Sequence, residues 1–109
     1  MLEAILGGVA AERVLLYLQS YEEAYGREIA TVFEIPISEI QKQLRKLEVG
    51  GILVSRLAGR SRLYTWNPRN PLVTALRNLL QEALESLPKS EQSKYFRGRR
   101  RPRRSGKLL

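Results

Sequence analysis

The chain has 109 residues, of which 43% are hydrophobic, a length that accommodates one domain with a modest core. It contains no Cys, no His and no Asp, which excludes disulfides, metal sites built on thiolate or imidazole, and the nucleophile arrangements that need these residues. We therefore do not expect an enzyme, and we expect no metal ion and no other cofactor.

The net charge of +8 is unevenly distributed along the chain. Residues 1–40 carry seven Glu and two Arg, whereas residues 41–77 carry eight Lys or Arg and one Glu. Residues 78–93 are slightly acidic, and residues 94–109 carry eight Lys or Arg without an acid. The sequence therefore predicts a body that is neutral overall and has one basic zone, followed by a basic tail.

No apolar run approaches the ~18 residues that predict a membrane span, and the first residues lack the order typical of a signal peptide. We expect a cytoplasmic protein without a membrane partner.

The first half of the chain predicts helices. Apolar residues at helical spacing from Val9 to about Glu23 predict an amphipathic helix, and Tyr25-Gly26 interrupts it. Residues 27–34 predict a short second helix, which Pro36 ends.

A third helix is predicted to begin at Ser38. Ser38 is a favourable N-cap, and Gln41 is three residues further on, as in a capping box. The apolar side of this helix carries Ile40, Leu44 and Leu47. Gly50-Gly51 is expected to end it, because glycine suits the left-handed conformation that closes helices.

Two strands and a last helix follow. Residues 52–57 and 62–66 are rich in β-branched and aromatic residues and predict a β-hairpin, in which we interpret Tyr64 and Trp66 as core packing. Pro71 suits the first turn of a helix that ends near Pro88. Its wide apolar face consists of Leu72, Leu76, Leu79, Leu80, Ala83, Leu84 and Leu87.

This order of elements is typical of a winged helix-turn-helix, a mainly α fold with a β-hairpin wing (α+β), whose third helix enters the major groove of DNA. If Ile40, Leu44 and Leu47 face the core, polar and basic side chains lie opposite. The candidates for contact with base edges are Ser38, Glu39, Gln41, Lys42, Arg45 and Lys46. The candidates for phosphate or minor-groove contact are Arg56, Arg60 and Arg62, and Arg27 and Ser61 are further candidates for contact with DNA.

A basic helix face is often only a solvated surface. Here the near-absence of acids over residues 41–77 favours nucleic-acid binding, because chance mixing would interleave the signs of charge.

Several short segments in order carry a resemblance to a known family. They are Tyr25-Gly-Arg-Glu-Ile-Ala, Ile40-Gln-Lys-Gln-Leu-Arg-Lys-Leu-Glu, Gly51-Ile-Leu-Val, Gly59-Arg, Tyr64 and Asn67-Pro. Over roughly residues 5–87 the chain resembles the ArsR-like winged-helix superfamily of prokaryotic transcriptional regulators. It is most similar to winged-helix modules that precede nucleotidyltransferase domains. The Cys and His ligands of metal-sensing members are missing, and no nucleotidyltransferase domain follows, so neither activity is inferred.

The wide apolar face of the last helix favours a homodimer, since one neighbouring helix covers only part of it. The seven apolar residues named for that helix are the predicted dimer interface. A two-fold dimer predicts a pseudo-palindromic site with half-sites about one helical turn apart.

Residues 1–88 are predicted to be the folded domain and residues 89–109 a basic, flexible tail. The tail is interpreted as a phosphate-binding arm, with an RNA-binding or acidic-partner segment and a solubility feature as alternatives. Tyr95 and Phe96 are candidates for stacking or insertion at a groove. The candidate DNA contacts in the tail are Arg97, Arg99, Arg100, Arg101, Arg103 and Arg104.

The leading hypothesis is a homodimeric, sequence-specific regulator of transcription that binds double-stranded DNA and is found with the nucleoid when bound. One alternative is an interaction subunit for a separate protein, such as a nucleotidyltransferase. Another is a binder of RNA or nucleoprotein.

Overall fold

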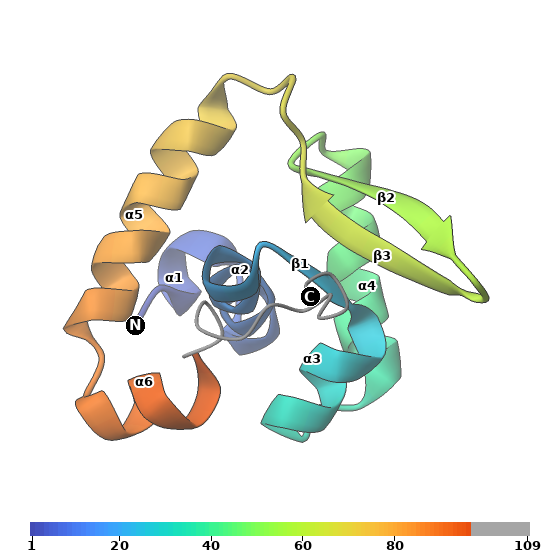
Figure 1. Cartoon of the computed structure of the whole chain (residues 1–109). Coiled ribbons are helices and arrows are strands. Elements are labelled where there is room, and N and C mark those ends of the chain that lie inside the picture. The colour runs from blue at the N-terminus through green and yellow to red at the C-terminus, as the bar shows by residue number, and fades with distance from the viewer. Residues whose placement is uncertain (97–109) are drawn as a thin grey trace, which may run out of the picture.

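A computed structural model of the protein describes residues 1–96, which form six helices and a three-stranded antiparallel sheet (Figure 1). The elements are α1 (Glu3–Leu6), α2 (Val9–Tyr21), β1 (Glu23–Tyr25), α3 (Gly26–Phe33), α4 (Ile37–Val49), β2 (Leu53–Ala58), β3 (Ser61–Trp66), α5 (Leu72–Ser86) and α6 (Lys89–Tyr95). The prediction of an α+β protein is confirmed. The four predicted helices and the hairpin are present, whereas α1, β1 and α6 were not predicted.

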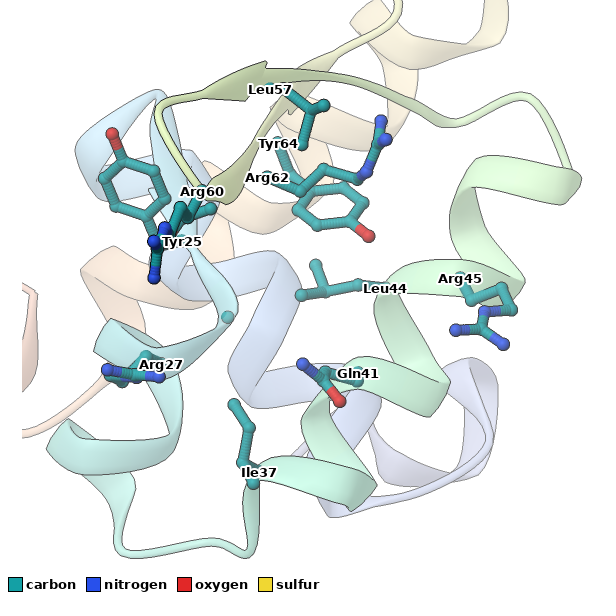
Figure 2. Close-up of a pocket in the computed structure, with 12 residues that line it drawn as sticks. Tyr25, Arg27, Ile37, Gln41, Leu44, Arg45, Leu57, Arg60, Arg62 and Tyr64 are labelled. Atoms are coloured by element: carbon teal, nitrogen blue, oxygen red, sulfur yellow. The ribbon is translucent and has the colours of Figure 1, made fainter.

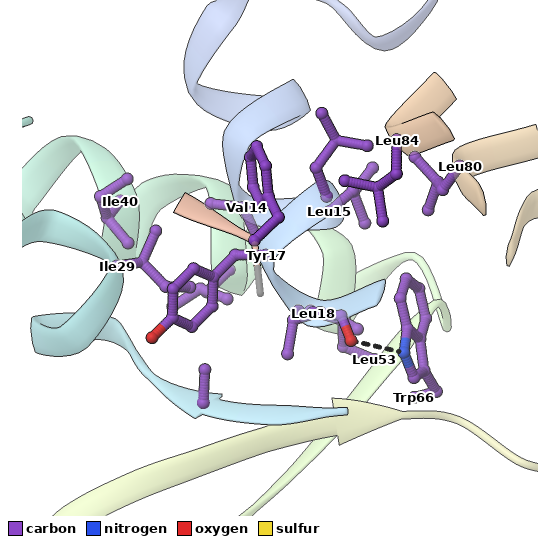
Figure 3. Packing of buried hydrophobic residues seen from close by; sticks show 14 of the residues in the cluster. Val14, Leu15, Tyr17, Leu18, Ile29, Ile40, Leu53, Trp66, Leu80 and Leu84 are labelled. Carbon is purple, nitrogen blue, oxygen red and sulfur yellow. Dashed lines mark hydrogen bonds between the residues drawn. The ribbon is translucent and has the colours of Figure 1, made fainter. Parts of the chain in front are cut away.

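The core is built around α2. Its residues Val14, Leu15 and Leu18 are almost completely buried, and the other helices and the sheet contribute side chains around them (Figure 3). The further core residues that Figure 3 labels are Tyr17, Ile29, Ile40, Leu53, Trp66, Leu80 and Leu84. Burying one such side chain stabilises the fold by about 1.5–3 kcal/mol, so this cluster is the main source of stability.

The sheet has the strand order β1-β3-β2. β1 comes from the connection between α2 and α3, and Tyr25 at its end pairs with Leu63 of β3. The hairpin closes by a two-residue turn, Gly59-Arg60, in which Gly59 has a φ of 69°. Glycine at the first position of such a turn is typical of the type II′ geometry, which matches the twist of the strands.

The joint between α3 and α4 depends on a close approach at Gly26. A β-carbon at this position would lie 3.2 Å from Cδ1 of Leu44, which is fully buried on α4. Glu34 then ends α3 in the left-handed region, with φ 56° and ψ 44°. Gly26 therefore lets the first turn of α3 rest on α4.

The predicted cap of α4 is wrong. The helix begins at Ile37 with Pro36 as its N-cap residue, and no side chain caps it. The amide groups of Glu39 and Ile40 both donate to the Pro36 carbonyl, so the N-cap lies two residues before the predicted one. Ser38 therefore lies inside the first turn.

The predicted end of α4 is confirmed at Gly51, which has a φ of 83°. The Gly51 amide donates to the Glu48 carbonyl, and the Ile52 amide donates to the Leu47 carbonyl at 2.9 Å. These two bonds form a Schellman motif, which satisfies the carbonyls of the last turn.

The apolar face of α5 serves mainly the core of its own chain. Leu80, Ala83 and Leu84 are buried in that core, and Leu76 and Leu87 pack against it. Val73 is also buried there, although the prediction omitted it. Leu72 and Leu79 are the two members of the predicted interface that are exposed. Most of this face is therefore covered within one chain, contrary to the expectation from the sequence.

Residues 89–96 also differ from the expected flexible tail. They form α6 and its end, and Phe96 is buried. The ring of Phe33 on α3 lies 4.9 Å from that of Tyr95 and 5.6 Å from that of Phe96, and the Arg13 guanidinium lies over Phe33 at 4.9 Å. Phe96 thus belongs to the packed body, and Tyr95 is partly buried against it.

Candidate nucleic-acid interface

The outward face of α4 brings together most of the residues predicted for base contact. The helix begins at Ile37, and its buried side is fixed by Ile40 and Leu44, so its opposite side faces solvent. A shallow depression runs along that side. Its lining residues, which we call the α4 stripe, are Ser38, Gln41, Lys42, Arg45, Lys46 and Val49. Glu39 is half-buried and does not line it.

A cleft of about 380 Å³ lies between α4, the start of α3 and the hairpin (Figure 2). The residues that line this hairpin cleft are Tyr25, Gly26, Arg27, Ile37, Gln41, Leu44, Arg45, Leu57, Arg60, Ser61, Arg62 and Tyr64. Four arginines from three parts of the chain therefore surround a floor of aliphatic and aromatic side chains. Such a cleft offers charge to an anion and apolar contact to a ring or a methyl group.

Gln41 and Arg45 line both the α4 stripe and the hairpin cleft. They are one helical turn apart, so they lie on the same side of α4. The two surfaces are consequently one continuous polar face, with these side chains at their common border.

Within residues 1–96, no cation of this face forms an ion pair with an acid. Among residues 1–96, the ion pairs join the amino group of Met1 to Glu3 and Glu12, and Arg77 to Glu22. None of the Arg or Lys residues of the α4 stripe or the hairpin cleft takes part in them. Their charge is therefore available to a ligand from solution.

The structure separates the three hairpin arginines that the sequence groups together. Arg62 pairs with Leu57, and Arg56 pairs with Leu63, which places the side chains of Arg56 and Arg62 on opposite faces of the hairpin. Arg60 and Arg62 line the hairpin cleft, and Arg56 does not. The strand boundaries predicted from the sequence already implied this alternation, which is the signal that distinguishes Arg56.

Six cleft residues were not among the predicted site residues: Tyr25, Gly26, Ile37, Leu44, Leu57 and Tyr64. Exposure of the apolar residues Ile37 (41%) and Leu57 (63%) distinguishes them from core residues. That exposure depends on the tilt of the hairpin over α4, which local sequence patterns do not report.

The phenol of Tyr64 lies in a mixed electrostatic environment. Burial raises the pKa of Tyr64 above its usual value of 10.0, and the Glu48 carboxylate adds to the rise, whereas Arg62 and Arg45 oppose it. The hydroxyl therefore stays protonated at neutral pH and keeps its capacity to donate a hydrogen bond.

A chain of side-chain hydrogen bonds joins α4 to the hairpin. The Ser55 hydroxyl donates to Oε2 of Glu48 at 2.7 Å, and Nη1 of Arg62 donates to the Ser55 hydroxyl at 3.0 Å. Glu48 thus faces the hairpin from the last turns of α4.

The predicted tail contacts Arg97, Arg99, Arg100, Arg101, Arg103 and Arg104 lie outside the described residues. Within residues 1–96, no helix combines the length and apolar character needed to cross a membrane. In the same part of the chain, no three His, Cys, Asp or Glu side chains are grouped as metal ligands.

No family model matches the chain, and no curated protein is significantly similar to it.

Proposed function

We propose that the protein is a winged helix-turn-helix regulator of transcription that binds double-stranded DNA. The observation that carries the proposal is the continuous face formed by the α4 stripe and the hairpin cleft, whose cations have no ion pair within residues 1–96. Electrostatic attraction to phosphates supplies much of the affinity of such proteins for DNA, and a protruding helix gives access to base edges.

In this proposal the α4 stripe enters the major groove. Gln41 is suited to adenine, and Lys42, Arg45 and Lys46 are suited to guanine, because each presents the matching donors or acceptors. Val49, 82% exposed, offers an apolar contact of the kind that a thymine methyl group makes. The stripe thus provides the sequence readout.

The hairpin cleft contributes the contacts to the backbone. Arg60 is at the tip of the hairpin, and Arg27 is near the start of α3, on the other side of the cleft. Phosphates held between these two side chains fix the position of the protein on the duplex without reading its sequence. Arg56 faces away from the cleft and is assigned a lesser role.

We further propose that two copies associate through the part of α5 that is exposed. Leu72 and Leu79 are 69% and 41% exposed, and Leu76 between them is partly exposed, so the three residues form one stripe with a spacing of four and three. That spacing is typical of paired helices. The interface proposed here is smaller than the sequence suggests, because the remaining members are buried in the core.

The test is selection from a random duplex library at two salt concentrations, with the full chain. A palindromic motif that survives the higher salt supports specific binding by a dimer. Failure to recover any motif contradicts the proposal. Structured or single-stranded RNA that outcompetes the duplex contradicts it as well, and favours an RNA-binding function. Sedimentation of the free protein measures the dimer separately, and Leu79→Glu is expected to produce the monomer.

A further inference from the structure

Glu48 is the one acidic residue in the basic segment 41–77. It is half-buried and borders a face that we propose binds phosphates, where a carboxylate repels the ligand. An acid in this position needs a structural reason. The structure supplies one in the contacts that Glu48 makes.

Those contacts cross from the helix to both strands of the hairpin. Glu48 on α4 accepts from Ser55 on β2 at 2.7 Å, and Ser55 accepts from Arg62 on β3 at 3.0 Å. The register places Ser55 opposite Tyr64 and Leu57 opposite Arg62, so Ser55 and Arg62 are diagonal neighbours on one face of the hairpin. This face is the one turned towards α4.

The position of β2 depends on contacts of this kind. In the order β1-β3-β2, strand β2 has a strand neighbour on one side only within residues 1–96. β3 has more support, because it also pairs with β1, whereas the buried residues Leu53 of β2 and Trp66 of β3 lie opposite each other and anchor both strands in the core. The contacts between β2 and α4 therefore largely determine the tilt of the hairpin over the helix.

We propose that Glu48 is a positioning residue that braces the hairpin against α4 through Ser55 and Arg62, and so sets the width of the hairpin cleft. Arg62 then serves the brace, while Arg60, for which no hydrogen bond is found within residues 1–96, is the hairpin arginine that binds phosphate. The effect on DNA rests on the proposed function, but the brace is a property of the free protein.

The first measurement is hydrogen exchange of the β2 amides that bond to β3, by NMR on the full chain without DNA. Ser55→Ala and Glu48→Ala are expected to raise the exchange rates about fivefold or more, since each breaks the brace. Glu48→Gln keeps an oxygen that accepts from Ser55 and is expected to stay within about twofold of the wild type. Unchanged exchange in Ser55→Ala overturns the proposal.

A matched control distinguishes loss of the Glu48 hydrogen bonds from loss of a negative charge on α4. Glu39→Gln removes the same charge from the first turn of α4, where no hydrogen bond joins it to the hairpin, and is expected to leave β2 exchange unchanged. If β2 exchange is faster in this variant as well, the rise in exchange rate results from the charge of α4. That outcome overturns the assignment to Glu48.

The second measurement is the ratio of affinities for the selected duplex and for a random duplex. Ser55→Ala is expected to reduce this ratio about fivefold, because a loose hairpin fits both duplexes similarly. Glu48→Gln is expected to raise both affinities together, about twofold to fivefold, by removing repulsion. An unchanged ratio in Ser55→Ala contradicts the role in selectivity. If the wild type binds no duplex while Ser55→Ala raises the exchange rates of the β2 amides, the proposed function is contradicted. The proposal that Glu48 braces the hairpin is then still supported.

Discussion

Nε1 of Trp66 donates a hydrogen bond of 3.3 Å to the backbone carbonyl of Leu18, which ties the end of β3 to the core helix α2 (Figure 3). The same indole lies under the guanidinium of Arg77 on α5, 5.2 Å from it. One side chain thus connects the sheet with two helices that are far apart in sequence.

Trp66→Phe is expected to lower the free energy of unfolding by about 1–3 kcal/mol. Most of this loss comes from the smaller ring, because the Leu18 carbonyl still accepts from the Glu22 amide at 2.8 Å. Urea unfolding followed by circular dichroism measures it, since the variant has no tryptophan fluorescence. Stability equal to that of the wild type would show that Trp66 does not connect the sheet to the helices.

Gly26→Ala is expected to destabilise the protein by about 1–3 kcal/mol, because the new methyl group meets Cδ1 of fully buried Leu44 at 3.2 Å. Gly50→Ala is the matched control, since Gly50 has φ −77° and its nearest neighbour would lie 3.4 Å away. Thermal unfolding of both variants makes the comparison. Equal midpoints would contradict a tight contact between α3 and α4 at Gly26.

Glu34→Gly is expected to stabilise the protein by about 0.5–1 kcal/mol. Glu34 is exposed and adopts a left-handed conformation that glycine tolerates better, and its negative charge opposes the dipole at the end of α3. Glu39→Gly, within α4, is expected instead to cost about 1 kcal/mol. Chemical denaturation gives both values, and a loss of stability in Glu34→Gly would refute the prediction.

Arg45→Ala is expected to weaken binding to a selected duplex by about 1–3 kcal/mol and to relax the preference at one base position. Arg69→Ala removes the same charge from an exposed residue that lines neither the α4 stripe nor the hairpin cleft, and is expected to have a small effect. Fluorescence anisotropy at fixed salt compares the two variants. Equal losses would indicate binding by net charge alone.

A chain that ends at Phe96 keeps all described residues and lacks seven Lys or Arg. If the tail is a phosphate-binding arm, this truncation weakens binding to all duplexes alike and flattens the dependence of affinity on salt. A full-length chain in which those seven residues are Gln is expected to behave like the truncated chain. An unchanged salt slope in the truncated protein argues against the arm.

Helical periodicity, glycines and prolines were sufficient to predict α2, α3, α4, α5 and the hairpin. They were also sufficient to predict the outward face of α4, because burial of Ile40 and Leu44 determines its orientation. The elements that were missed are short or depend on distant partners. β1 exists because residues 23–25 pair with residues 63–65 of β3, and no local pattern reports that pairing.

The composition of residues 89–96 is polar and does not favour a packed helix. α6 is held at its end by Tyr95 and Phe96, which contact Phe33 on α3, a residue far from them in the sequence. The α5 face was misjudged for a related reason. The spacing of its leucines is compatible with a dimer interface and with a core. Which of the two they form depends on how α2 packs against α5, which is a property of the tertiary structure.

Tyr25 is both the last residue of β1 and the N-cap of α3, where its amide donates to Oε1 of Glu28 at 2.8 Å. No spacer residue separates strand from helix at this point. An insertion or deletion there would shift either the pairing with Leu63 or the start of the helix, and it is expected to be rejected during evolution. The turn at Gly59-Arg60 only connects two strands, and no helix begins there. Natural variation in chain length should therefore accumulate at the hairpin tip. There the hairpin can become longer or shorter while the packing of the helices and of β1 against the core is preserved.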